Sequence, residues 1–316
     1  MAIYALFSWV HFKQKVAVTP QFFSGILANN HRLLMNLQYT NNEQSRILQF
    51  LIPEAIRTLL FVSVEHAYEI QRFTFVFLTF LFFDRYLRKW FRPAEALAGV
   101  CMMSTLIMST YLDDLQESFA LLMFTYLLGL GAIRDHKKNA LSVILWIAAL
   151  NNETSLSLLI VFFFYNLSSK SLKGLLASMR ETFLVGAPAI ISTMIIRYIT
   201  RNQPHLGGAL HFKDNWAGIV SGFLMNPLNY YESRYTFFIL IFGLLIGVAF
   251  SQFSKISKFS RSALMVIPFF ILAHLITGVI SEPRQMSPLL LIIIPITLKV
   301  VLQQDSSPQK TCFAEI

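Results

Sequence analysis

Long apolar runs, separated by short polar loops, occupy most of the chain from residue 69 to residue 303. They fall at 69–83, 94–112, 118–133, 140–150, 156–167, 183–200, 235–250, 263–280 and 288–303. Such runs are typical of helices that cross a bilayer, which need about 20 mostly apolar residues. The composition agrees, because 55% of the 316 residues are hydrophobic and only 14% are charged, against about 25% in soluble domains. We expect an all-α, polytopic transmembrane helical bundle with about nine to ten membrane segments.

The charge of the loops alternates along the chain. Basic loops are expected at 84–92, 134–138, 168–180 and 252–261, whereas the loops at 111–117, 151–154 and 281–285 are acidic or nearly neutral. Basic loops mark the cytoplasmic side of a membrane protein, so the first set is predicted inside and the second outside. The net charge of +9 is therefore interpreted as a topology signal, and no nucleic-acid partner is expected.

The first 68 residues differ from the rest. Residues 1–12 are apolar but too short to cross a bilayer, so 1–68 is predicted to hold a truncated first span and a long outer loop. Amphipathic pieces such as 47–64, which contains Glu54 and Arg57, are expected to lie in the membrane interface. The multi-spanning bundle then occupies 69–303, and 304–316 is a cytoplasmic tail.

The polar stretch 151–154 (NNET) divides one apolar segment into two short halves. Both flanking loops are basic, so residues 140–167 are predicted to form a short helical hairpin with this stretch at its outer tip. Asn151 or Asn152 can cap the second half, and Glu153 then lies in its first turn, where a carboxylate is favoured. A contact between Glu153 and a substrate or partner is the compatible alternative.

Ionisable residues on the outer side are the candidates for chemistry, because such groups are costly at membrane depth. Asp113 and Asp114 could hold a divalent metal, since hard cations prefer carboxylate oxygens; their structural alternative is an acidic helix start. Glu282 and Arg284 could bind an anion or simply pair with each other. Arg197 lies near the outer end of its span, where its side chain can reach the interface. The outward acids are Asp113, Asp114, Glu117, Glu153, Asp214, Glu232 and Glu282.

Motifs of soluble enzymes are absent from the sequence. The two cysteines, Cys101 and Cys312, and the seven histidines show no metal-ligand spacing. There is no phosphate-binding loop, no dinucleotide fingerprint and no nucleophile elbow. The sequence thus predicts no certain cofactor.

Three stretches resemble the GT-C-like superfamily of membrane glycosyltransferases, which take sugars from polyprenyl-phosphate donors. Residues 45–55 (SRILQFLIPEA) are similar to the stretch after the first outer loop, 149–159 (ALNNETSLSLL) to a polar hairpin, and 282–295 (EPRQMSPLLLIIIP) to the start of a late helix. Their order resembles the family over most of the chain.

The resemblance implies an inverting glycosyltransferase, or a homologue, that acts on lipid-linked sugars at the outer face of a bacterial cytoplasmic membrane. The family's base is usually an aspartate soon after the first span, but residues 13–68 contain no Asp. Glu43 is the nearest substitute, and Asp113 and Asp114 are the other catalytic candidates. Arg46, Glu153, Glu282 and Arg284 are the expected substrate-binding residues.

Because the expected catalytic aspartate is missing, other functional classes stay open. The chain could be an N-terminally shortened or degenerate member that acts as a noncatalytic membrane subunit. A transporter or flippase of a lipid or polysaccharide precursor is another alternative, because transporters also place broken helices at their binding sites. The bilayer is the one partner that every alternative shares.

Overall fold

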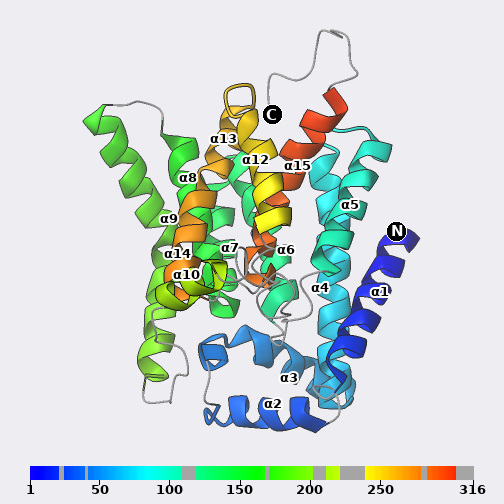
Figure 1. The fold of residues 1–316 in the computed structure, drawn as a ribbon. Helices are drawn as coiled ribbons and strands as arrows, with labels where there is room; N and C mark the ends of the chain where they lie inside the picture. The colour runs from blue at the N-terminus through cyan, green and yellow to red at the C-terminus, as the bar shows by residue number, and fades with distance from the viewer. Residues whose placement is uncertain are drawn as a thin grey trace. The chain divides into compact units, whose positions relative to one another are not determined.

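The computed structural model describes residues 1–20, 25–39, 42–108, 118–167, 171–201, 211–220, 239–278 and 283–303. Within these ranges the chain is helical and contains no β-strand (Figure 1). The predicted all-α class is therefore confirmed for this part of the protein. The chain forms two compact units, which we describe separately.

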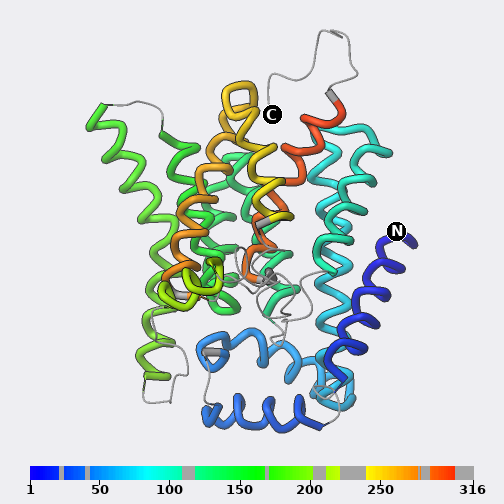
Figure 2. Tube along the Cα trace, in the orientation of Figure 1, coloured from blue at the N-terminus to red at the C-terminus, as the bar shows by residue number. Residues whose placement is uncertain are grey.

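Unit 1 consists of Met1–Phe83, Asp114–Leu159 and Leu167–Gly207. Its α7 packs against both α6 and α9, and the shorter helices α2 and α3 pack together. Figure 2 traces the path of the chain through these helices. The helices are α1 (Ala2–Val18), α2 (Leu27–Met35), the 3-10 helix η2 (Asn42–Ser45), α3 (Leu48–Leu60), most of α4 (Val64–Leu87), α6 (Ser118–Arg134), α7 (Lys138–Asn151), the 3-10 helix η4 (Glu153–Ser157) and α9 (Leu172–Ile199).

Unit 2 consists of Asp84–Asp113, Ile160–Asn166 and Gly208–Ile316. Helix α15 is its central element and packs against α5, α12 and α13, with Leu289, Leu290 and Leu291 fully buried. The helices are α5 (Pro93–Met108), most of α8 (Leu158–Asn166), α10 (Phe212–Val220), the π-helix η6 (Ile239–Gly243), α12 (Leu244–Ser251), α13 (Lys258–Leu264), α14 (Val266–Thr277), the 3-10 helix η7 (Pro283–Met286) and α15 (Ser287–Gln303).

The start of α9 differs from the sequence-based expectation. The basic stretch 168–180 was expected to be a loop, but α9 begins at Leu172. Ser171 caps it, because its hydroxyl accepts a hydrogen bond from the Gly174 N–H at 3.2 Å. A serine at this position satisfies one of the free N–H groups of a helix start. Lys173 and Arg180 therefore lie on the first half of a 28-residue helix.

The predicted break at 151–154 is present. Helix α7 ends at Asn151, and Asn152 has an extended backbone with φ −161° and ψ 119°. The Asn152 side-chain oxygen accepts a hydrogen bond from the Thr154 N–H at 3.0 Å, so Asn152 caps η4 as one of the two expected asparagines. The apolar segment is thus divided where its polar residues predict.

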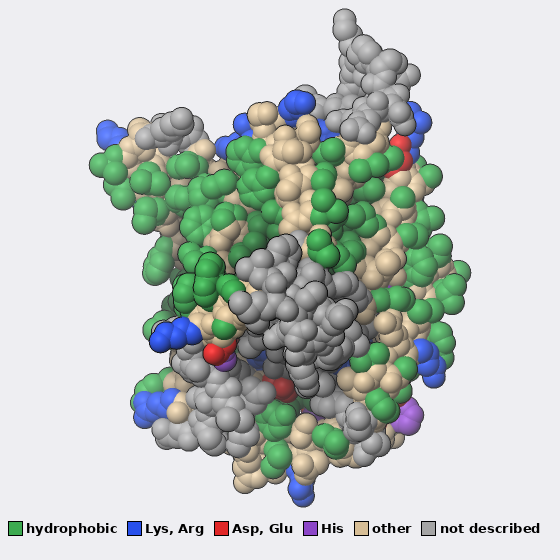
Figure 3. Space-filling view, viewed as in Figure 1, with side chains coloured by type: hydrophobic (Ala, Val, Ile, Leu, Met, Phe, Trp, Pro, Cys, Tyr) green, Lys and Arg blue, Asp and Glu red, His purple; other side chains and the backbone are tan. Residues whose placement is uncertain are grey.

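Two helical stretches are long and apolar enough to cross a bilayer: Leu172–Ile199 and Lys258–Ile276. The remaining apolar helices in the described residues have 10 to 17 residues, which is below the length that a straight crossing requires. Hydrophobic side chains cover the middle of the helices, and Lys and Arg side chains gather toward helix ends (Figure 3). Two such helices indicate an association with the membrane by length and composition alone.

Glycine allows a close helix contact inside unit 1. A Cβ atom added to Gly129 of α6 would lie 2.5 Å from a Cδ atom of Leu158. Leu158 is fully buried, and it follows directly after η4. The absence of a side chain at Gly129 therefore lets the polar turn at 152–157 lie against α6.

Candidate functional site

Glu43 is a buried carboxylate in η2, the turn between α2 and α3. Its side chain is 7% exposed, and the Gln49 amide donates a hydrogen bond to its Oε2 atom at 2.9 Å. Gln49, in the first turn of α3, is 2% exposed. A buried carboxylate needs such partners, because an unpaired charge is strongly unfavourable away from water.

Gln44 fixes the turn that carries Glu43. Its amide nitrogen donates to the Leu34 carbonyl at 3.0 Å, and its amide oxygen accepts from the Tyr39 N–H at 3.1 Å. The Leu34 carbonyl belongs to the last turn of α2, where the helix leaves its carbonyls free, and the Tyr39 N–H belongs to the segment that follows. The path from α2 to α3 is thereby determined by one fully buried side chain.

Tyr39 lies within electrostatic reach of Glu43. Burial, and to a lesser extent the negative charge of Glu43, raises the pKa of the Tyr39 hydroxyl to about 12. Both effects disfavour the phenolate. The Tyr39 hydroxyl therefore stays protonated further into the alkaline range than an ordinary tyrosine, and it can act as a hydrogen-bond donor.

Arg46 follows Glu43 on the next turn of the chain. The Arg46 N–H donates to the Glu43 carbonyl at 3.0 Å, and the Arg46 Nε atom is buried. A guanidinium and a carboxylate thus lie within a four-residue stretch of unit 1. Guanidinium groups favour phosphates and carboxylates because they can donate two parallel hydrogen bonds.

The second carboxylate is Glu153 of η4, which forms an ion pair with Arg197 of α9. The Glu153 side chain is 28% exposed and the Arg197 side chain 62% exposed, so solvent reaches both. The expected first-turn position of Glu153 is confirmed. Its partner was not predicted, because a reach to the interface had been the expectation for Arg197.

Buried hydrogen bonds attach the η4 turn to α6. The Asn151 amide donates to the Ser118 carbonyl at 2.8 Å, and the Tyr126 hydroxyl lies 3.1 Å from the Ser157 hydroxyl. Asn151 and Ser118 are both almost fully buried. The carboxylate of Glu153 therefore projects from a rigidly held turn.

The two carboxylates lie at the same end of unit 1. Both η2 and η4 pack against α9, and α3 packs against α6 and α7. Figure 1 shows α2 and α3 at the end of unit 1 where α6 begins and α7 and α9 end. We call this set the carboxylate cluster of unit 1; it comprises Glu43, Arg46, Gln49, Glu153 and Arg197.

A second polar network joins α2, α3 and α4. His31, which is 4% exposed, lies 3.1 Å from the Tyr68 hydroxyl and 3.0 Å from the Glu54 carboxylate. Glu54 also accepts two hydrogen bonds from Arg57, at 2.6 and 2.8 Å. The Arg57 guanidinium lowers the pKa of Glu54 to about 2, and His31 adds to that effect. Sequence spacing indicates the Glu54–Arg57 pair but not the link to His31, 23 residues earlier.

Of the other candidate residues, Asp214 is described in α10, where its carboxylate lies 3.6 Å from the His211 Nδ1 atom; the side chains of the rest are outside the described structure. Asp113, Asp114 and Glu282 fall in stretches that the structure does not describe, and only the backbone of Arg284 is described, in η7. Among the described residues, no group of three His, Cys, Asp or Glu side chains could hold a metal ion. The metal site at Asp113 and Asp114 stays a prediction.

Comparisons with known proteins add no family. The chain matches no protein-family description, no curated protein and no solved structure.

Proposed function

We propose that this chain is a multi-pass protein of the bacterial cytoplasmic membrane that transfers a sugar from a polyprenyl-phosphate donor at the outer face. The observation that carries the proposal is the carboxylate cluster of unit 1. The cluster includes the expected base, Glu43, and the guanidinium groups of Arg46 and Arg197, and both of its 3-10 turns, η2 and η4, pack against α9. The resemblance described above supplies the reaction class, and the cluster supplies the chemical groups.

The proposed roles follow from the chemistry of each group. The Glu43 carboxylate accepts the proton of the acceptor hydroxyl, whose oxygen then attacks the anomeric carbon with inversion. Gln49 orients Glu43, because its amide is hydrogen-bonded to Oε2. Arg46 and the solvent-accessible Arg197 offset the charge that develops on the departing lipid phosphate. The role of Arg284 in phosphate binding stays a prediction from the sequence, because only its backbone is described, in η7.

The proposal is tested with the full chain in proteoliposomes. The probes are radiolabelled undecaprenyl-phosphate hexoses, supplied one at a time with a bacterial lipid extract as the source of acceptor. We expect one donor to be consumed, and Glu43→Gln to lower turnover at least 100-fold, in the range for loss of a general base. Glu65→Gln, on the neighbouring α4, is the matched control and should stay within about twofold. Consumption of no donor, or full turnover by Glu43→Gln, contradicts the proposal.

A noncatalytic membrane subunit is the second candidate. The observation in its favour is that both carboxylates already have partners: Glu43 accepts a hydrogen bond from Gln49, and Glu153 forms an ion pair with Arg197. In that case the cluster holds the helix ends together and performs no chemistry. Loss of stability in Glu43→Gln, without any sugar transfer by the parent protein, would favour this role.

A further inference from the structure

A small hollow in unit 2 lies among the ends of α4, α13 and α15. Its walls include Trp90, Phe259 and Lys299, with Ile292 and Ile296 of α15 as the apolar floor. The cavity volume is about 10 Å³, which is room for about one water-sized group. The hollow can therefore accept a single oxygen atom but not an entire headgroup.

The hollow has an aromatic side. Tyr86 and Trp90 meet edge to face with ring centroids 4.7 Å apart, and the Trp90 and Phe259 rings stack at 6.5 Å. Tyr86 and Phe259 are buried, whereas Trp90 is half-buried. Tryptophan and tyrosine are enriched where a membrane protein crosses the headgroup level. The aromatic cluster thus indicates the depth at which this end of unit 2 would lie.

Lys299 is the one charged side chain in the wall of the hollow. It is half-buried, and within the described ranges no carboxylate forms an ion pair with it. Burial removes part of the water around its ammonium group, which makes an anion a favourable replacement. The position on α15 is rigid, since the preceding residues from Leu289 to Ile294 are buried.

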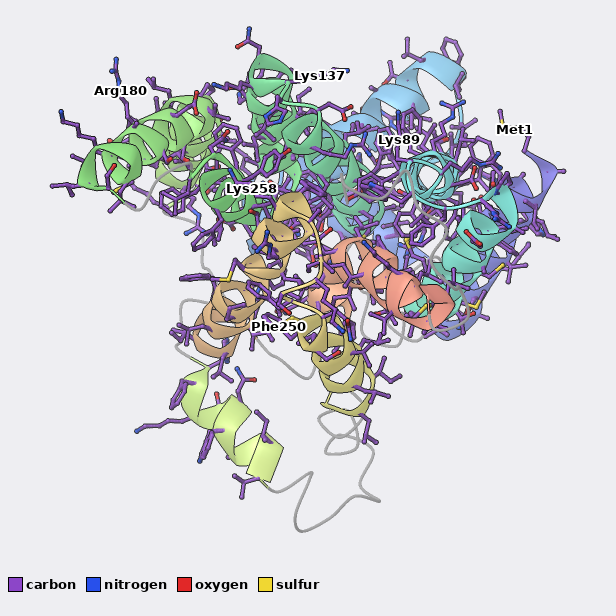
Figure 4. All side chains as sticks on the ribbon, turned by 90° about the horizontal axis from the view of Figure 1, so that it is seen from above. Met1, Lys89, Lys137, Arg180, Phe250 and Lys258 are labelled. Atoms are coloured by element: carbon purple, nitrogen blue, oxygen red, sulfur yellow. The ribbon has the colours of Figure 1, made fainter. Side chains whose placement is uncertain are left out.

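The surroundings of the hollow are strongly basic. Figure 4 looks onto this end of unit 2, where Lys89 and Lys258 are labelled. Asp84 pairs with Arg88 and Glu95 accepts a hydrogen bond from the Arg92 N–H, so these two carboxylates offset only part of the positive charge. The exposed basic residues of unit 2 that flank the hollow in sequence are Arg85, Arg88, Lys89, Arg92, Lys255, Lys258 and Arg261.

We propose that this hollow binds the phosphate of an anionic phospholipid of the inner leaflet, with the Lys299 ammonium as the direct contact. One phosphate oxygen enters the hollow beside Lys299, and the Trp90 ring lies along the glycerol region. The flanking basic residues raise the local concentration of acidic lipids, while the Lys299 ammonium favours a phosphate whose charge no choline cation offsets. The inference rests on the membrane insertion proposed above but not on sugar transfer.

The test uses the fluorescence of Trp90 in the full chain. Replacing Trp9, Trp146 and Trp216 with Phe leaves Trp90 as the sole tryptophan; these three side chains are 50%, 46% and 59% exposed, so the changes fall on the surface. The protein is reconstituted in phosphatidylcholine vesicles, and brominated phosphatidylglycerol or brominated phosphatidylcholine is added. The bromine atoms are placed on the acyl carbons nearest the headgroup, where they quench a neighbouring tryptophan.

We expect brominated phosphatidylglycerol to quench Trp90 at a lower mole fraction than brominated phosphatidylcholine. Lys299→Gln and Lys299→Met should lower that preference at least fivefold, and Lys299→Arg should retain most of it. Lys255→Gln is the matched control, because it removes the same charge from the same end of unit 2 without touching the hollow. It should change the preference less than twofold.

Three results would overturn the proposal. Equal quenching by both lipids shows that Trp90 is near lipid but that no acidic lipid is selected. Equal loss in Lys299→Gln and Lys255→Gln shows diffuse charge attraction and no site. Absence of quenching by either lipid shows that this end does not reach the membrane at all. None of these readouts depends on turnover, so failure here is distinct from failure of the sugar-transfer proposal.

Discussion

The Arg197 guanidinium of α9 donates a hydrogen bond to the Glu153 carboxylate of η4, 44 residues earlier in the chain. This ion pair connects the end of the longest helix of unit 1 to the polar turn between α7 and α8. Two structural features stabilise the Glu153 carboxylate: it lies in the first turn of η4, and it pairs with the Arg197 guanidinium. Any role in substrate binding would have to compete with that partner.

We predict a measurable but small coupling between these two residues. Glu153→Gln and Arg197→Gln should each lower the free energy of unfolding by about 0.5–1 kcal/mol, with a coupling of similar size in the double variant, because exposed ion pairs contribute little. Unfolding in detergent micelles followed by tryptophan fluorescence provides the measurement. Arg180→Gln, an exposed arginine near the other end of α9, should have no effect, and additive single variants would contradict the coupling.

Features that depend on neighbouring residues could be predicted from the sequence, whereas contacts between distant helices could not. The break at 151–154 and the cap by Asn152 were predictable, because an asparagine that ends an apolar run has a specific local use. The start of α9 was not, since Lys173 and Arg180 have ordinary helix propensities and only their charge suggested a loop. The partners of Glu153 and His31 depend on helix packing across 44 and 23 positions, which no local pattern encodes.

The contact between Gly129 and Leu158 predicts a difference between two neighbouring glycines of α6. Gly129→Val should lower the free energy of unfolding by about 1–3 kcal/mol, because the added atoms overlap the buried Leu158 side chain. Gly131→Val is the control, since no atom lies within 4 Å of the Cβ position there. Equal effects of the two substitutions on the unfolding midpoint would contradict the close contact at Gly129.

Glu54 predicts an acid-sensitive link between α2 and α3. Its pKa is lowered from 4.5 to about 2 in the folded protein by Arg57 and His31, so the unfolded chain binds more protons between these values. The stabilisation is therefore complete above pH 4.5 and is lost as the pH falls toward 2. We expect this loss to be about 1 kcal/mol, since Glu54 is partly exposed.

Thermal unfolding as a function of pH would measure this contribution. Glu54→Gln should show a smaller decrease in the melting midpoint between pH 4.5 and 2 than the parent protein shows. Glu65→Gln should behave as the parent does, because it leaves the His31–Glu54–Arg57 network intact. An identical decrease in all three proteins would exclude Glu54 as a source of the acid sensitivity.

The alternation of loop charge predicts that Lys137 and Arg201 lie on opposite sides of the membrane. Both are exposed. If the basic loops face inward, the hairpin of α7 and α8 returns to the inner side, and α9 then crosses once to carry Arg201 to the outer side. Lys137→Cys and Arg201→Cys are made in a background in which Cys101 and Cys312 are serine. In intact cells, a membrane-impermeant maleimide should label the cysteine at 201 and not the one at 137, and permeabilisation should expose both.

Labelling of the cysteine at 137 alone in intact cells would reverse the orientation, and equal labelling of both would contradict a membrane-spanning arrangement. Equal labelling would also contradict the position of Lys299 at the inner leaflet, because a basic loop would then face the outside of the cell.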